Sequence, residues 1–259
     1  MTNTILKRAF QNKSSFFPLL RKLFYALEGL FLPQVWHLKK SIRSFSGWKK
    51  PDLRILDAAA GEGHFSYWMR RKNPSWKITA ISSDESLVKS GNEFFQKINK
   101  DKVEFQHGSM EHFIQPLTYN LALCSDLITG DMRESKIFSN FYTSMKAEAL
   151  LIISKIASIE KLESKADWNT EEQINAVREM LIRAGFRKVD VHIQYGPLGR
   201  LAWTLSELIP KKLLDVSRML YILLPIYFLS IAPICLIFNG IDSHIQNNEG
   251  RGLIVKAWK

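Results

Sequence analysis

The chain has 259 residues, of which 46% are hydrophobic and 24% are charged, as in an ordinary globular protein of one large or two small domains. This composition excludes an intrinsically disordered chain, and two cysteines are too few for a disulfide-stapled miniprotein. The formal net charge is +11, and +9 of it comes from the first 50 residues, so the rest of the chain is nearly neutral.

The first 50 residues combine basic with aromatic side chains and predict a helical extension. Charges recur between apolar positions, as at Arg21 and Lys22, which lie between two leucines and a Leu-Phe pair. Amphipathic helices of this kind bind the surface of an anionic bilayer, but they also cap hydrophobic cores with their charges in water. Both interpretations remain open. Nucleic acid is a weaker third interpretation, because basic charge alone is not specific.

Between residues 53 and 195, short apolar runs alternate with stretches of helical spacing. The first run, 53–58, is followed by a glycine-rich turn and a helix at 64–70. This order of strand, tight turn and helix brings backbone N–H groups against a nucleotide-like ligand. The alternation predicts an α/β sheet with helices on both faces. Further strands are predicted at 77–81, 103–107, 119–124, 150–154, 188–194 and 252–258, and helices at 86–97, 133–145 and 170–184.

The turn after the first strand carries a known family pattern, an acid followed by alternating small residues and glycines: Asp57-Ala58-Ala59-Ala60-Gly61-Glu62-Gly63. It resembles motif I (DxGxGxG) of the class I S-adenosylmethionine-dependent methyltransferases. The later strands, and the segment 181–186 (LIRAGF) before the sixth, follow in the family's order, so the resemblance covers about 51–195 plus the final strand. It implies a doubly wound, seven-stranded, mostly parallel sheet whose last strand lies antiparallel beside the sixth.

The resemblance implies that the chain binds S-adenosylmethionine. Glycines in motif I let the backbone approach the amino-acid portion of the donor, since a side chain there would block it. The acid orients the loop or holds the donor's ammonium group through water. The two cysteines lie in apolar runs without metal-ligand spacing, so no metal is expected. The implied donor-binding residues are Asp57, Ala59, Gly61, Gly63, Ser82, Asp84, Ser109, Met110 and Ser125.

Two positions depart from the family pattern. Ala59 replaces the first glycine of motif I, which is a small change. Ser82 stands at the end of the second strand, where the family usually has an acid that binds both ribose hydroxyls, and a serine offers no anionic oxygens. Three consequences are open: Asp84 reaches back in its place, the donor binds less tightly, or catalysis is lost and the protein is a non-catalytic scaffold.

The acceptor side is less well marked. Asp126 follows the fourth strand, where the transferred methyl group should lie, and it is our candidate for contacting the acceptor, with a helix N-terminal cap as the alternative. His107, His112 and His192 are candidate bases, although lone histidines are more often structural. The loop at 195–200 follows the sixth strand and is expected to border the acceptor pocket.

Residues 219–238 form a run of 20 residues without a charge. As a helix this run would be long enough to cross a bilayer. It lies between the sixth and seventh strands of one sheet, so a single crossing would separate 252–258 from its neighbours. A re-entrant hairpin broken at Pro225 and Pro233, an interfacial segment and a buried cap over the pocket are the remaining alternatives.

The predicted organisation is a basic aromatic helical extension (1–50), a methyltransferase core (51–195), an apolar helical insertion (196–250) and the last core strand (251–259). The predicted function is S-adenosylmethionine-dependent methyl transfer to a hydrophobic or lipid-linked small molecule, in the cytoplasm at the inner membrane face. A soluble small-molecule methyltransferase of a specialised pathway and a non-catalytic scaffold are the alternatives. Nucleic acid is not the expected acceptor, because no Asp-Pro-Pro-Tyr-like signature follows the fourth strand.

Overall fold

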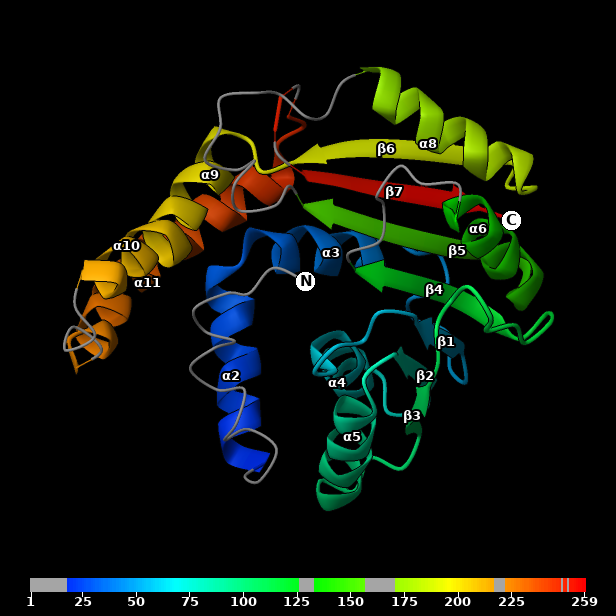
Figure 1. Ribbon diagram of the computed structural model, residues 1–259, viewed down its shortest axis with the longest axis horizontal. Helices are drawn as coiled ribbons and strands as arrows, with labels where there is room; N and C mark the ends of the chain where they lie inside the picture. The colour runs from blue at the N-terminus through cyan, green and yellow to red at the C-terminus, as the bar shows by residue number, and fades with distance from the viewer. Residues whose placement is uncertain (1–17, 126–132, 157–170, 217–221, 248, 251) are drawn as a thin grey trace. The chain divides into compact units, whose positions relative to one another are not determined.

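A computed structural model describes residues 18–125, 133–156, 171–216, 222–247, 249–250 and 252–259. Seven strands form one sheet in the order β3-β2-β1-β4-β5-β7-β6, which confirms the predicted doubly wound topology (Figure 1). The neighbouring pairs among β1 to β5 are parallel, whereas β7 runs opposite to β5 in Figure 1. The strands are β1(Arg54–Asp57), β2(Lys77–Ser82), β3(Val103–His107), β4(Tyr119–Ser125), β5(Met145–Ile156), β6(Lys188–Gln194) and β7(Gly252–Trp258).

Helices cover both faces of the sheet. On one face α4(His64–Lys72) and α5(Glu85–Lys97) pack against β2 and β3. On the other, α6(Arg133–Ser144) and α8(Glu171–Arg183) contribute Phe138, Phe141 and Leu181 to a core with alternate residues of β4 and β5. Each helix begins and ends within two residues of its predicted bounds.

Strand β5 is the one element of the sheet whose length differs clearly from the prediction. It begins at Met145, five residues before the predicted start. Tyr119 pairs with Met145 but Leu121 pairs with Leu150, so β5 carries extra residues at this point, where Glu148 has a φ of 60°. Charged residues interrupt the apolar run there, which is why the pattern showed only the regular part of the strand.

The chain divides into two compact units. The core unit takes in the described residues of 41–155, 169–191 and 253–259, and holds most of the sheet. The helical unit takes in those of 1–40, 156–168 and 192–252, so the N-terminal helices and the insertion belong to the same unit. Its helices are α2(Pro18–Phe31), most of α3(Pro33–Arg43), α9(Pro197–Trp203), the π-helical turn η1(Thr204–Leu208), α10(Ile209–Val216) and α11(Leu224–His244).

Helix α11 corrects one expectation for the apolar insertion. A hairpin broken at the prolines is wrong, because Pro225 lies in the first turn, where no N–H is needed, and the helix continues through Pro233. Only 22% of the most apolar stretch of α11 is buried, and its role as a cap over the pocket stays a prediction. Among the described residues α11 is the helix long and apolar enough to cross a membrane, judged by length and composition.

Candidate functional site

The predicted donor loop begins where β1 ends, at the carboxyl edge of the sheet. Asp57 is fully buried, and the next residue, Ala58, donates its N–H to the carbonyl of Leu123 on β4 over 2.7 Å. Ala60 donates to the carbonyl of Ile81 on β2 over 3.2 Å. The loop is therefore held between the two strands that flank β1, at the edge where doubly wound sheets bind ligands.

Both glycines of the loop adopt the left-handed backbone conformation that favours glycine. Gly61 has a φ of 51° and Gly63 a φ of 85°. A Cβ on Gly63 would also lie 2.7 Å from the ring of Phe105 on β3. Gly63 is therefore required by packing as well as by the turn, which adds a structural reason to the role in donor approach that the resemblance implies.

The carboxylate of Asp57 caps the helix that follows the loop. Gly63 occupies the N-cap position of α4 but has no side chain to cap it. Instead, Ser66 in the first turn of α4 donates its hydroxyl to Asp57 Oδ2 over 2.7 Å. Burial raises the pKa of Asp57 to about 6, against a smaller lowering by hydrogen bonds from the Ser66 side chain and backbone. The geometry thus supports the predicted role of Asp57 in orienting the loop.

The second oxygen of the same carboxylate is a candidate donor ligand. Asp57 Oδ1 is buried and accepts no hydrogen bond from any residue that the structure describes. A buried acceptor without a partner costs folding free energy, so such groups usually serve a bound ligand or water. An ammonium group, directly or through a water, would fit this oxygen, and the amino-acid end of S-adenosylmethionine carries one.

Ser82, which stands where the family usually has an acid, lies at the end of β2. Ser82 is nearly buried, and its hydroxyl accepts the N–H of Asp84 over 3.2 Å. The Oδ1 atom of Asp84 accepts the N–H groups of Ser86 and Leu87, over 2.8 and 3.4 Å, and so forms the N-cap of α5. Oδ1 of Asp84 thus serves the cap, and the role of Asp84 at the ribose stays a prediction.

The remaining predicted residues lie after β3 and β4. Ser125 donates its hydroxyl to the carbonyl of Ala59 over 3.3 Å, joining the end of β4 to the donor loop. Met110 is buried in the core that also contains Ala58 and Ile81. The hydroxyl of Ser109 accepts the N–H of Glu111 over 3.2 Å.

The residues predicted on the acceptor side are Asp126 and three histidines. Asp126 lies outside the described residues, so its predicted role stays a prediction. All three candidate bases, His107, His112 and His192, are exposed. Nε2 of His107 lies 3.2 Å from the carbonyl oxygen of Ser83. Within the described ranges, no three metal-binding side chains come together.

A polar cleft of about 300 Å³ opens at the opposite edge of the sheet. Residues at the amino ends of strands line it, among them Arg54, Lys77 and Tyr119. The donor loop follows the carboxyl end of β1, so this cleft is not the predicted donor site.

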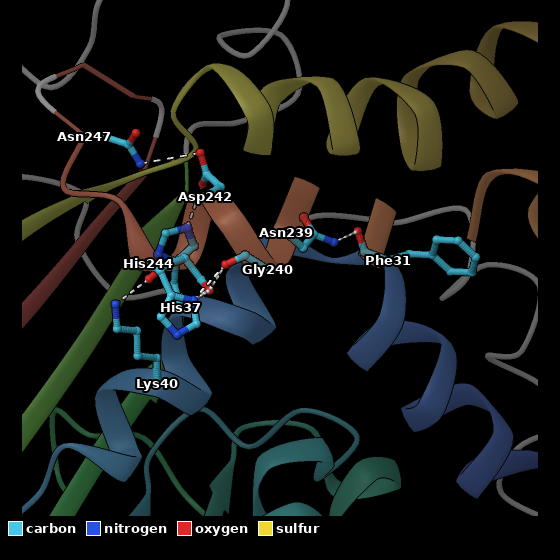
Figure 2. Close-up of polar contacts among 9 residues, drawn as sticks. Phe31, His37, Lys40, Asn239, Gly240, Asp242, His244 and Asn247 are labelled. Carbon is cyan, nitrogen blue, oxygen red and sulfur yellow. Dashed lines mark hydrogen bonds and ion pairs between the residues drawn. The ribbon is translucent and has the colours of Figure 1, made fainter. Parts of the chain in front are cut away.

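Sequence reasoning missed a buried polar cluster in the helical unit (Figure 2). Nε2 of His37 on α3 donates to Oδ2 of Asp242 on α11 over 2.8 Å, and Asp242 is 1% exposed. Asn247 donates to the other oxygen of the same carboxylate over 3.5 Å. A Cβ on Gly199 would lie 2.5 Å from Asp242 Oδ2, so α9 approaches the carboxylate through a glycine. No sequence signal connects His37 to Asp242, because they are 205 positions apart.

A comparison with protein families matches residues 49–194, more than half of the chain, to the family described as "Methyltransferase domain". No curated protein sequence matched the chain. The family comparison and the ordered strand pattern thus agree on the same segment.

Solved structures of similar fold share little sequence with this chain. A phosphoethanolamine N-methyltransferase 2 from Haemonchus contortus, solved with S-adenosyl-L-methionine, is 14% identical with a TM-score of 0.59 and covers 97% of this chain; the chain spans only 59% of that protein. The cyclase SpnF is 15% identical with a TM-score of 0.56, over 87% of this chain and 81% of its own. A geranyl diphosphate methyltransferase, solved with GPP and sinefungin, is 10% identical with a TM-score of 0.52, over 85% and 77%.

Proposed function

We propose that this chain, which belongs to the class I S-adenosylmethionine-dependent methyltransferases, methylates a hydrophobic or lipid-linked small molecule at the cytoplasmic face of a membrane. When bound, S-adenosylmethionine supplies a methyl group on a sulfonium, and methyl transfer depends mainly on the alignment of donor and acceptor. The chain's part is to hold that alignment. The backbone of the loop at Gly61 faces the amino-acid end of the donor. Asp57 Oδ1 accepts a hydrogen bond from the donor's ammonium group, and Ser82 contributes a single hydroxyl at the ribose position.

The exposed face of α11 is the observation that supports a hydrophobic acceptor. Ile226, Leu229 and Ile237 are 67%, 77% and 59% exposed, and most of the other exposed side chains of the helix are aliphatic or proline. The one exposed hydroxyl, that of Ser230, donates to the carbonyl of Ile226 in the same helix over 3.0 Å. A contiguous apolar face of this kind marks a membrane or partner contact rather than a surface in water.

The polar contacts on the opposite face of α11 support a helix that lies on the bilayer rather than one that crosses it. Asn239 donates to the carbonyl of Leu30 over 3.1 Å. It also donates to the carbonyl of Phe31 over 3.3 Å, and Asp242 accepts from His37 (Figure 2). A crossing would strip these polar groups from their partners inside hydrocarbon, which is costly. We therefore propose that α11 lies in the plane of the interface, with its exposed face toward the acyl chains.

The structural comparisons are compatible with a lipid-like acceptor without identifying it. The geranyl diphosphate methyltransferase is named for a prenyl acceptor, so this fold can serve a methyltransferase of an isoprenoid. SpnF has a similar fold but is named as a cyclase, not as a methyltransferase. A role other than methyl transfer is therefore the alternative for this chain. Ser82 favours that alternative, because it lacks the two anionic oxygens usual at the ribose.

The test removes the apolar face without touching the donor loop. In the Leu229→Gln/Ile237→Gln variant we expect vesicle binding to fall by at least tenfold, because each buried aliphatic side chain contributes roughly 1.5–3 kcal/mol. Transfer of labelled methyl from S-adenosylmethionine to a lipid extract should fall with it. The control is Ile114→Gln/Ile182→Gln, which changes two exposed isoleucines of the core unit. Unchanged vesicle binding in both variants would favour the soluble alternative.

A further inference from the structure

The core unit carries an exposed patch in which tryptophans and cations from two segments meet. We propose that this basic tryptophan patch binds the phosphate head groups of an anionic bilayer. The inference adds a second, electrostatic contact to the membrane role proposed above and rests on that role. The patch consists of Arg43 at the end of α3, of Trp48, Lys49 and Lys50 after it, and of Trp68, Arg71 and Lys72 on α4.

Ring contacts and hydrogen bonds hold the two segments together. The rings of Trp48 and Trp68 stack with centroids 5.3 Å apart, and the Arg43 guanidinium lies 5.4 Å from the centroid of Trp68. Trp76 Nε1 donates to the carbonyl of Lys50 over 2.8 Å. The backbone that carries the lysines is therefore fixed beside the end of α4, rather than being a free basic tail.

The side chains of α4 that join the patch share one face of the helix. Arg71 and Lys72 follow Trp68 by three and four positions, which places all three on the same face. Arg70 does not belong to the patch, because its side chain is buried and its Nη2 atom lies 3.9 Å from Asp101 Oδ1.

The charge of the patch is not explained by the helix alone. Cations in the last turn of α4 are favourable because of the helix dipole. Arg43 ends α3 and gains in the same way, but Lys49 and Lys50 lie in no helix, yet they add two exposed cations to the same place. The nearest acid in their segment is Asp52. Five exposed cations around two aromatic rings therefore form a surface complementary to a sheet of negative charge.

The ring geometry favours lipid over nucleic acid. Proteins that bind single-stranded nucleic acid stack bases on open aromatic faces. Here Trp48 stacks on Trp68 and meets Trp76 edge-on with centroids 5.0 Å apart, and Arg43 covers Trp68. Tryptophans with neighbouring Lys and Arg are typical of the head-group level of a bilayer, where an aromatic body and a charged tip are both accommodated.

The experiment measures sedimentation of the full chain with two kinds of vesicle, phosphatidylcholine alone and phosphatidylcholine with phosphatidylglycerol. In Lys49→Gln/Lys50→Gln/Lys72→Gln we expect the gain in affinity from phosphatidylglycerol to fall about fivefold per lysine, roughly 100-fold in all. Affinity for phosphatidylcholine alone should not change. The control is Lys77→Gln/Lys89→Gln/Lys97→Gln, three exposed lysines elsewhere on the core unit, which should keep most of the gain.

The outcomes separate this inference from the proposed function. Loss of the phosphatidylglycerol gain in the patch variant alone supports the inference. An equal loss in the control variant would show that only net charge matters and would overturn it. So would a wild-type chain that responds to phosphatidylglycerol no more than to neutral lipid, or that binds RNA in preference to the vesicles. Failure of the proposed function instead appears as unchanged binding to neutral vesicles in Leu229→Gln/Ile237→Gln.

Discussion

Asp57 shows at the scale of one residue how binding and stability oppose each other. Its carboxylate is buried, caps α4 through Ser66 and leaves Oδ1 without a partner. Folding therefore shifts the carboxyl group toward its protonated form, because burial raises its pKa from 3.8 to about 6. Holding this group ionised at neutral pH costs on the order of 3 kcal/mol of folding free energy. A binding role for the carboxylate explains why such a cost is tolerated.

The change Asp57→Asn tests this opposition. The folded pKa lies above the unfolded one, so the contribution of Asp57 to stability is complete below about pH 4, declines up to about pH 6 and is constant above. We expect the stability of Asp57→Asn relative to wild type to rise across that interval, measured by denaturant unfolding. Affinity for S-adenosylhomocysteine at neutral pH should fall at least tenfold. A stability difference independent of pH would contradict the assignment.

The two loop glycines should respond differently to substitution. Asn tolerates a φ of 51°, so Gly61→Asn should stay folded while its side chain obstructs the approach of the donor to the backbone. Gly63→Ala should unfold more easily, by roughly 1–3 kcal/mol, because its Cβ meets Phe105 at a φ of 85°. Thermal melting and calorimetric titration of both variants check this. Wild-type donor affinity in folded Gly61→Asn would mean that the site is misplaced.

At the scale of elements, α11 has two faces with different partners. One face joins the helical unit through Asn239 and Asp242, and the other exposes aliphatic side chains. The ring of Phe228 also lies 5.0 Å from that of Phe31 on α2. Helix α2 thus covers part of α11 within the helical unit, while its Leu19, Lys22 and Leu23 are exposed. Capping of the core and binding to a membrane, the two interpretations of the extension, both stay predictions.

The buried pair of His37 and Asp242 should matter for the stability of the helical unit. His37→Ala leaves the Asp242 carboxylate buried without its nearest partner, and breaking a buried pair in this way costs about 3–5 kcal/mol. The exposed His112→Ala serves as control and should change little. Thermal unfolding followed by circular dichroism distinguishes them. Equal melting temperatures would show that the pair contributes nothing.

The sequence predicted those features that depend on neighbouring residues and missed those that depend on contacts between distant residues. The strands and the turn at Gly61 and Gly63 were predicted because apolar spacing and left-handed glycines are local signals. The exposure of α11 could not be predicted, because an apolar helix looks the same in sequence whether it is buried or not. The pairing of His37 with Asp242, and the capping of α4 by Asp57, depend on contacts made by the fold.

At the scale of the whole molecule, the extension and the insertion come from opposite ends of the chain yet form one unit. The basicity of the first 50 residues is likewise divided, because Arg43, Lys49 and Lys50 belong to the core unit while Lys22 and Lys40 belong to the helical unit. The two proposed membrane contacts therefore belong to different units and differ in character, apolar on α11 and electrostatic on the basic tryptophan patch.

Calorimetric titration of the purified protein with S-adenosylmethionine and S-adenosylhomocysteine tests the central claim most directly. We predict binding of both with micromolar dissociation constants, lost in Gly61→Asn while that variant keeps the wild-type circular dichroism spectrum. This result would show that Ser82 is tolerated at the ribose and would justify a screen of lipid acceptors. No binding of either ligand at millimolar concentration by a folded wild-type protein would contradict the methyltransferase assignment and favour a non-catalytic role for the fold.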